Sequence, residues 1–194
     1  MTAADARTQV AIVGSAGKMG QTLVRLAKED PTFELVAVLD QGDPMSALAA
    51  FPGAVAVDFS SPAGTRALAE IAPSARVGIV CGTTGLDAAT DAALDIASRA
   101  VPVFTAANMS IGVHVLGVLI ARAIAMLGPG FDLEMVESHH RRKVDAPSGT
   151  ALKLASIAQA ARARLASPAN LVHGRHPDRR AARTPSEIGM HAIR

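Results

Sequence analysis

The sequence is poor in the residues that usually supply an aromatic core or a disulfide framework. Its 194 residues include no Trp, no Tyr, five Phe and a single cysteine, Cys81. Hydrophobic residues still make up 49% of the chain, so the core must be built from Ala, Val, Leu and Ile. This length fits one domain or two small ones. A single cysteine excludes an intramolecular disulfide and fits a reducing compartment, and we expect Cys81 to be a small buried residue.

Strong net charge and long apolar runs are also absent. The formal net charge is +2, and we interpret the arginine-rich run at 173–183 as a solvated loop, not a nucleic-acid footprint. The longest apolar stretch, 111–127, contains His114 and Arg122 and is short for a membrane span. No signal peptide is recognisable at the N-terminus. We therefore expect a soluble, cytoplasmic protein that binds neither nucleic acid nor a membrane.

The first half of the chain alternates between strand-like and helix-like segments. Short runs rich in Val, Ile and Ala, which are typical of buried strands, lie at 8–14, 33–39, 54–59, 76–80 and 101–105. Segments with helical spacing lie between them, at 21–29, 63–72 and 86–99. This alternation predicts an α/β fold with a Rossmann-like, doubly wound parallel sheet and right-handed crossovers. In such sheets ligands bind beyond the carboxyl ends of the strands.

A glycine-rich turn, Gly14-Ser15-Ala16-Gly17-Lys18-Met19-Gly20, joins the first strand to the first helix. Its glycines let backbone N–H groups approach a pyrophosphate at the helix N-terminus. Asp40 ends the next strand, at the distance from the turn where an acid reaches the hydroxyls of the adenosine ribose. Ala16 replaces the second glycine of the usual fingerprint, so a plain strand-to-helix turn is the alternative. The order of strand, turn, helix, strand and acid nevertheless predicts a dinucleotide-binding domain over residues 1–109.

The second half follows a different pattern. We predict a helix at 111–127, a strand at 131–137, a helix at 151–165, a polar basic loop at 166–185 and a strand at 188–193. These elements form a smaller α+β substrate domain over residues 110–194. No internal repeat stands out.

Most of the candidate catalytic and anion-binding residues lie between residues 137 and 151. His139 and His140 are adjacent, and histidine exchanges protons near neutral pH. Lys143 supplies a charge for an anion, and Ser148-Gly149-Thr150 offers a cap and free N–H groups at a helix start. Surface histidines are the alternative, and no further ligand stands at zinc spacing, so we predict no metal site. Together with a nicotinamide cofactor, this segment predicts a reductase for a small carboxylate-bearing substrate.

The segment from Glu137 to Ala151 resembles the signature of the 4-hydroxy-tetrahydrodipicolinate reductase (dihydrodipicolinate reductase) family of lysine and diaminopimelate biosynthesis. The resemblance extends over the chain, at 10–20, Asp58-Phe59, Gly82-Thr83-Thr84-Gly85, 108–113 and Ile188-Gly189. It implies reduction of 4-hydroxy-tetrahydrodipicolinate by NADH or NADPH, in a homotetramer joined through the second domain. It implies that His139 donates the proton and that Lys143 assists this protonation and holds the substrate. It also implies that the dicarboxylate is bound by His140, Gly149 and Thr150.

The resemblance also implies which residues line the nicotinamide cofactor: Gly14, Ser15, Ala16, Gly17, Lys18, Met19, Asp40, Gly82, Thr83, Thr84, Ala106, Ala107, Asn108 and Met109. Asp40 favours NADH by repelling a 2′-phosphate, whereas Lys18 favours NADPH, so the preference stays open.

The chain departs from the family pattern in three ways. The interval between Asp40 and Asp58 is short, as in the shorter-chain branch of the family. Arg142 stands where the family often has a third histidine. Members of the family also continue beyond the point where this sequence ends, so we expect a truncated chain. Two alternatives follow: a nucleotide-binding fragment without catalysis, and a reductase for another small carboxylate-bearing imine.

Overall fold

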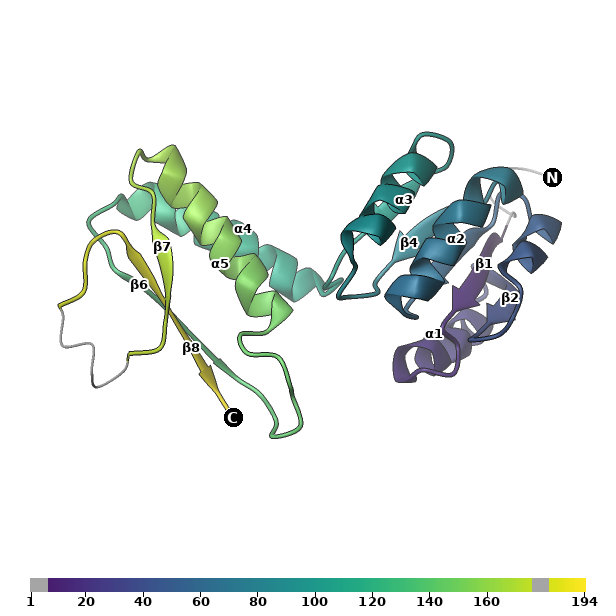
Figure 1. Ribbon diagram of the computed structural model, residues 1–194, viewed down its shortest axis with the longest axis horizontal. Coiled ribbons are helices and arrows are strands. Elements are labelled where there is room, and N and C mark those ends of the chain that lie inside the picture. Colours follow the sequence, from purple (N-terminus) through teal and green to yellow (C-terminus); the bar gives the residue numbers. More distant parts are fainter. Residues whose placement is uncertain (1–6, 176–181) are drawn as a thin grey trace. The chain divides into compact units, whose positions relative to one another are not determined.

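The computed structural model describes residues 7–175 and 182–194, and the chain divides into two compact units. Unit 1 comprises Met1–Ala107 and unit 2 comprises Asn108–Arg194 (Figure 1). Each unit has its own sheet and its own core.

Unit 1 is built on a five-stranded parallel sheet in the order β2-β1-β3-β4-β5. The strands are β1 (Thr8–Val13), β2 (Phe33–Leu39), β3 (Val55–Asp58), β4 (Gly78–Cys81) and β5 (Val103–Thr105). The helices are α1 (Lys18–Glu29), α2 (Pro62–Ala75) and α3 (Ala88–Ser98), with a 3₁₀ helix η1 (Met45–Ala50). The predicted doubly wound α/β fold is confirmed. Strand order reverses between β1 and β3, and the crevice at such a switch point is where doubly wound sheets bind ligands.

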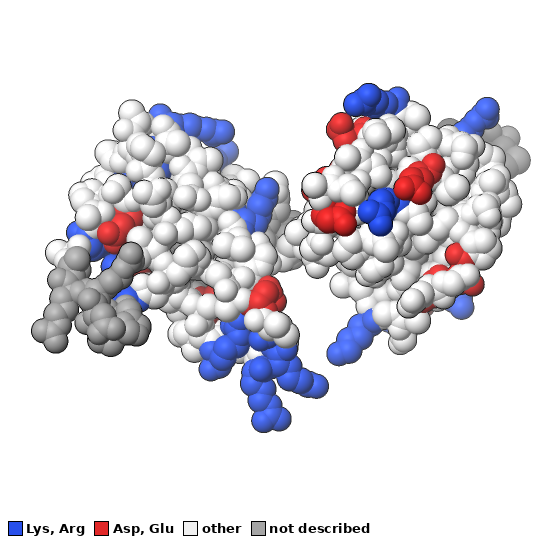
Figure 2. All heavy atoms as spheres, in the orientation of Figure 1, with Lys and Arg blue, Asp and Glu red and all other residues white. Residues whose placement is uncertain are grey.

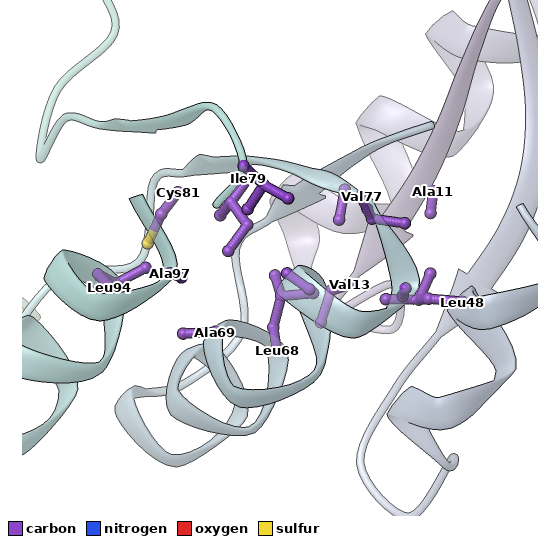
Figure 3. Close-up of a cluster of buried hydrophobic side chains, with 14 of the residues drawn as sticks. Ala11, Val13, Leu48, Leu68, Ala69, Val77, Ile79, Cys81, Leu94 and Ala97 are labelled. Carbon is purple, nitrogen blue, oxygen red and sulfur yellow. The ribbon is translucent and has the colours of Figure 1, made fainter. Parts of the chain in front are cut away.

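The main core of unit 1 lies between the sheet and the layer formed by α2, α3 and η1 (Figure 3). Alternation along the strands decides which side chains enter it: Ala11 and Val13 of β1 do, together with Ile79 and Cys81 of β4. The helices contribute Leu68 and several alanines, whose small side chains let the layers approach without aromatic residues. Cys81 is buried, as predicted.

The opposite face of the sheet carries α1. Val10 and Ile12, the alternate residues of β1, point to this side and face the same hollow as Leu23 and Ala27 of the helix. The helix covers only part of the face, leaving an open apolar hollow of about 530 Å³ beside it.

Unit 2 contains a second, three-stranded parallel sheet in the order β6-β8-β7, packed against two helices. Its elements are α4 (Ile111–Leu127), β6 (Leu133–Ser138), α5 (Gly149–Arg164), β7 (Asn170–His173) and β8 (Glu187–Ile193). Gly117 lets α4 approach α5 closely, because a Cβ there would lie 2.8 Å from Ile157 Cδ1. Among the residues described, no helix is both long and apolar enough to cross a bilayer.

The prediction of one loop over 166–185 was wrong in part, because β7 lies inside it. This strand has only four residues, and among the described strands it pairs with β8 at the edge of the sheet. Its sequence therefore carries little of the alternation that identifies a strand.

The interpretation of 173–183 as solvated also fails at Arg183, whose side chain is only 17% exposed and pairs with Asp132 and Glu134. Residues 176–181 of that run lie outside the described residues.

Candidate functional site

A hollow of about 630 Å³ opens in unit 1 at the carboxyl ends of β1 and β3, next to the glycine-rich turn. Gly14 has φ +81°, and a Cβ there would lie 2.6 Å from the carbonyl oxygen of Phe59. Gly20 is as restricted, since a Cβ would overlap the Gly14 carbonyl oxygen. Both glycines are therefore required for α1 to begin directly against the end of β1. This is the geometry in which a helix N-terminus offers N–H groups to a phosphate.

Asp40 lies in the same hollow, and its carboxylate binds the glycine-rich turn. It accepts hydrogen bonds from the backbone N–H groups of Gln41 and Ala16 and from the Ser15 hydroxyl, the last at 3.3 Å. The Gln41 and Ala16 amides lower the pKa of Asp40, so the group is ionised at neutral pH. Asp43 lines the hollow as well, and no Lys or Arg is among the described residues that line it.

The predicted cofactor residues do not all meet in this hollow. Gly14, Gly17 and Asp40 line it. Ser15, Ala16, Lys18 and Met19 complete the turn and the start of α1 around it. Five predicted cofactor residues of unit 1 do not line the hollow. They follow β4 and β5 in the chain: Gly82, Thr83, Thr84, Ala106 and Ala107. Asn108 and Met109 belong to unit 2.

Sequence reasoning missed the role of Asp58, a fully buried carboxylate at the carboxyl end of β3. Its Oδ1 accepts from the Ser60 amide at 3.1 Å and from the Ser60 hydroxyl. Its Oδ2 accepts from the hydroxyls of Thr65 and Thr83, the latter at 3.0 Å, and from the Cys81 thiol at 3.5 Å. Burial and the nearby Asp58 charge raise the pKa of the Cys81 thiol. Asp58 thus ties the loop after β3, which lines the hollow, to the loop after β4.

In unit 2 the loop after β6 carries the predicted catalytic residues. The His139 amide donates to the Ile193 carbonyl at 3.1 Å, which ties the start of the loop to the end of β8. The ammonium of Lys143 lies 2.7 and 2.9 Å from the two carboxylate oxygens of Asp145. Hydrogen bonding from Lys143 lowers the pKa of Asp145. An anion that uses Lys143 must therefore compete with Asp145.

His140 is exposed, and its Nδ1 accepts from the Arg142 amide at 3.2 Å. Lys and Arg side chains crowd the tip of this loop (Figure 2). Across the described residues, no group of three His, Cys, Asp or Glu side chains could hold a metal ion.

The loop ends at the N-terminus of α5, which is capped. Ser148 Oγ accepts from the Ala151 amide at 3.1 Å. Gly149, which is exposed, and Thr150, which is half-buried, begin the first turn, and Thr150 Oγ1 accepts from Asn108 Nδ2 at 2.9 Å. Two residues predicted for different ligands, Asn108 for the cofactor and Thr150 for the substrate, are therefore bonded to each other within unit 2.

Comparisons with known proteins identify the family of the chain. Residues 8–109 match the family model "Dihydrodipicolinate reductase, N-terminus", and residues 112–194 match "Dihydrodipicolinate reductase, C-terminus". Over 170 residues the chain is 43% identical to a 4-hydroxy-tetrahydrodipicolinate reductase of Nitratidesulfovibrio vulgaris (strain Miyazaki F), covering 80% of this chain and 66% of that protein. In an alignment of 201 positions it is 41% identical to the enzyme of the same name from Thermomicrobium roseum. That alignment covers 95% of this chain and 76% of that protein.

A solved structure gives the same result for the fold. The dipicolinate-bound dihydrodipicolinate reductase from Paenisporosarcina sp. TG-14 superposes with a TM-score of 0.73 at 25% identity, covering 97% of this chain and 78% of that one. The chain thus spans about two thirds to three quarters of the length of these relatives. Both family models match in chain order and together cover nearly all of the residues, so the chain belongs to the dihydrodipicolinate reductase family.

Proposed function

We propose that this chain reduces 4-hydroxy-tetrahydrodipicolinate to tetrahydrodipicolinate in lysine and diaminopimelate biosynthesis. A bound nicotinamide supplies the hydride, His139 supplies the proton, and the 4-hydroxyl leaves as water. The observation that carries the proposal is the loop after β6. It places His139 and Lys143 in the same short segment as the capped N-terminus of α5.

The substrate class follows from the charges of that segment. A dicarboxylate needs two anion sites, and we assign one to Lys143 with His140 and the other to Gly149 and Thr150 at the α5 N-terminus. The relative from Paenisporosarcina is described with dipicolinate bound, which is a dicarboxylate of the same size class. Reversing the charge at Lys143 should raise the KM for a dicarboxylate far more than the KM for a neutral substrate analogue. Equal effects would contradict the assignment.

For the cofactor, we propose that residues 1–109 bind the dinucleotide and that NADH is preferred over NADPH. The support is the hollow beside the glycine-rich turn, which Asp40 and Asp43 line, whereas no described Lys or Arg lines it and Lys18 lies outside the lining, at the start of α1. A 2′-phosphate there would face the ionised Asp40 carboxylate. Gly82, Thr83, Thr84, Ala106, Ala107, Asn108 and Met109 remain assigned to the nicotinamide end. Asp40→Asn should raise kcat/KM for NADPH relative to NADH, and an unchanged ratio would reject this determinant.

The test of the whole proposal is oxidation of NADH and NADPH by the purified chain, with substrate generated from aspartate semialdehyde and pyruvate. We expect oxidation that is lost in His139→Gln. Cofactor binding without oxidation would favour a non-catalytic nucleotide-binding chain, and oxidation with a different imino acid would favour a related reductase.

Sedimentation would test the proposed homotetramer, and fractionation of cells would test the proposed cytoplasmic location.

A further inference from the structure

Glu137, on β6, has no role in the proposed reaction so far, yet its carboxylate lies between the proton donor and the substrate-binding helix. The side chain is 12% exposed. Its Oε1 accepts from the Ser148 amide at 2.7 Å and its Oε2 accepts from the Ser148 hydroxyl. Burial acts to raise the pKa of Glu137, but the bonds from Ser148 and the charge of His139 outweigh it and lower the pKa. The group is therefore a carboxylate at neutral pH.

The second observation is an orphaned ring nitrogen. Nδ1 of His139 is buried and has no hydrogen-bond partner among the described residues. The Glu137 Oε2 atom lies 3.5 Å from it, just beyond a good hydrogen bond. A buried polar nitrogen without a partner is costly, and a small rotation of the ring brings this one into bonding range of a carboxylate. A carboxylate accepts only, so Nδ1 must carry the proton when the two groups bond.

We infer that Glu137 is a positioning residue, which fixes the tautomer of His139 and ties it to the N-terminus of α5 through Ser148. The inference rests on the proposed role of His139 as proton donor. With Nδ1–H bonded to Glu137, Nε2 is the nitrogen left to face the substrate, and it carries the proton that is transferred when the ring is charged. The negative charge of Glu137 stabilises the imidazolium before the transfer. The Glu137 carboxylate thereby orients the proton donor, His139, and also holds Ser148 at the N-terminus of α5, where we place an anion site.

Other charged groups near this pair do not replace Glu137. Arg194 acts on the Glu137 carboxylate through its charge, and its guanidinium donates to the Asp145 carbonyl. Lys143 is held by Asp145. The contacts of Arg194 and Lys143 with Asp145 do not involve Glu137, so we expect a Glu137 variant to isolate the contribution of that carboxylate.

The experiment is a ¹H–¹⁵N spectrum of the histidine rings of the full chain, recorded for wild type, Glu137→Gln and Glu134→Gln. The matched control lies on the same strand, where Glu134 Oε2 is 2.8 Å from Nε2 of a different histidine, His191. We expect neutral His139 in the wild type to carry its proton on Nδ1, and Glu137→Gln to shift the population toward the Nε2–H form. Glu134→Gln should leave His139 unchanged. A wild-type His139 with its proton on Nε2, or a spectrum that Glu137→Gln does not alter, would overturn the inference.

The pH dependence of kcat separates the failure of this inference from the failure of the proposed function. In Glu137→Gln the basic limb of the kcat profile should move to lower pH, because the variant removes the negative charge beside the ring that donates the proton. kcat at neutral pH should fall about tenfold, more than any change in KM for NADH. A tautomer shift without a change in the kcat profile would show that the pairing exists but that His139 is not the proton donor. If Glu137→Gln does not fold, Glu137→Asp keeps the charge, and it must shift both readouts in the same direction by less.

Discussion

Replacing Asp58 by Ala should destabilise unit 1 by about 3–5 kcal/mol. The Asp58 carboxylate is fully buried and accepts from three hydroxyls, one amide and one thiol. Truncation leaves the hydroxyls of Thr65 and Thr83 without their acceptor, and these residues are 0% and 8% exposed. Each orphaned buried donor costs about 1–3 kcal/mol, and loss of the charge-assisted bonds adds to this. Ser60 is exposed, so water can replace the carboxylate there and we add nothing for it.

The assay is urea unfolding followed by circular dichroism, with Asp40→Ala as the matched control. Asp40 also accepts several hydrogen bonds in the same unit, but water reaches its carboxylate and can take over those bonds. We therefore expect a clearly smaller loss for Asp40→Ala. Thr65→Val should cost less than Asp58→Ala, because it removes one donor and leaves the carboxylate its other partners. Equal losses for the Asp58 and Asp40 variants would refute the claim that burial makes this network costly to break.

Three further substitutions test other parts of the structure. Gly20→Ala should abolish NADH binding, measured by fluorescence titration, because the new Cβ meets the Gly14 carbonyl oxygen and must displace the turn. Hydrogen bonds from Arg175 and then His191 lower the pKa of Glu134 to about 2, so its stabilisation is complete above about pH 5 and is lost as the pH falls toward 2. The stability of Glu134→Gln should therefore depend less on pH in that window, as thermal melts at several pH values would show. Arg162 is buried and donates to the carbonyls of Phe131, Ser167 and Pro185, so Arg162→Met should lower the urea midpoint of unit 2, whereas an unchanged midpoint would show that water satisfies these carbonyls.

The elements of unit 1 could be predicted from sequence because its strands and helices have different periods and are separated by glycine or proline. The glycine-rich turn was recognisable because a tight turn at the start of a helix has few sequence solutions. β7 could not be found in the same way, since a four-residue edge strand shows too little alternation. The pairing of Arg183 with Glu134 joins positions 49 residues apart, which no local pattern reveals.

The two carboxylates that sequence reasoning did not assign, Asp58 and Glu137, occupy equivalent places in unrelated sheets. Each lies in the last two residues of a parallel strand, β3 or β6, and each accepts hydrogen bonds from a serine in the loop that follows. The carboxyl end of a parallel strand is where functional loops gather, and a carboxylate can accept from several donors there at once. An acid at such a strand end, followed by Ser or Thr before the next helix, is thus a local sequence signal for a loop anchor. Asp58-Phe-Ser60 shows that signal at short range. Glu137 and Ser148 lie eleven positions apart, which explains why the second anchor could be recognised only in the structure.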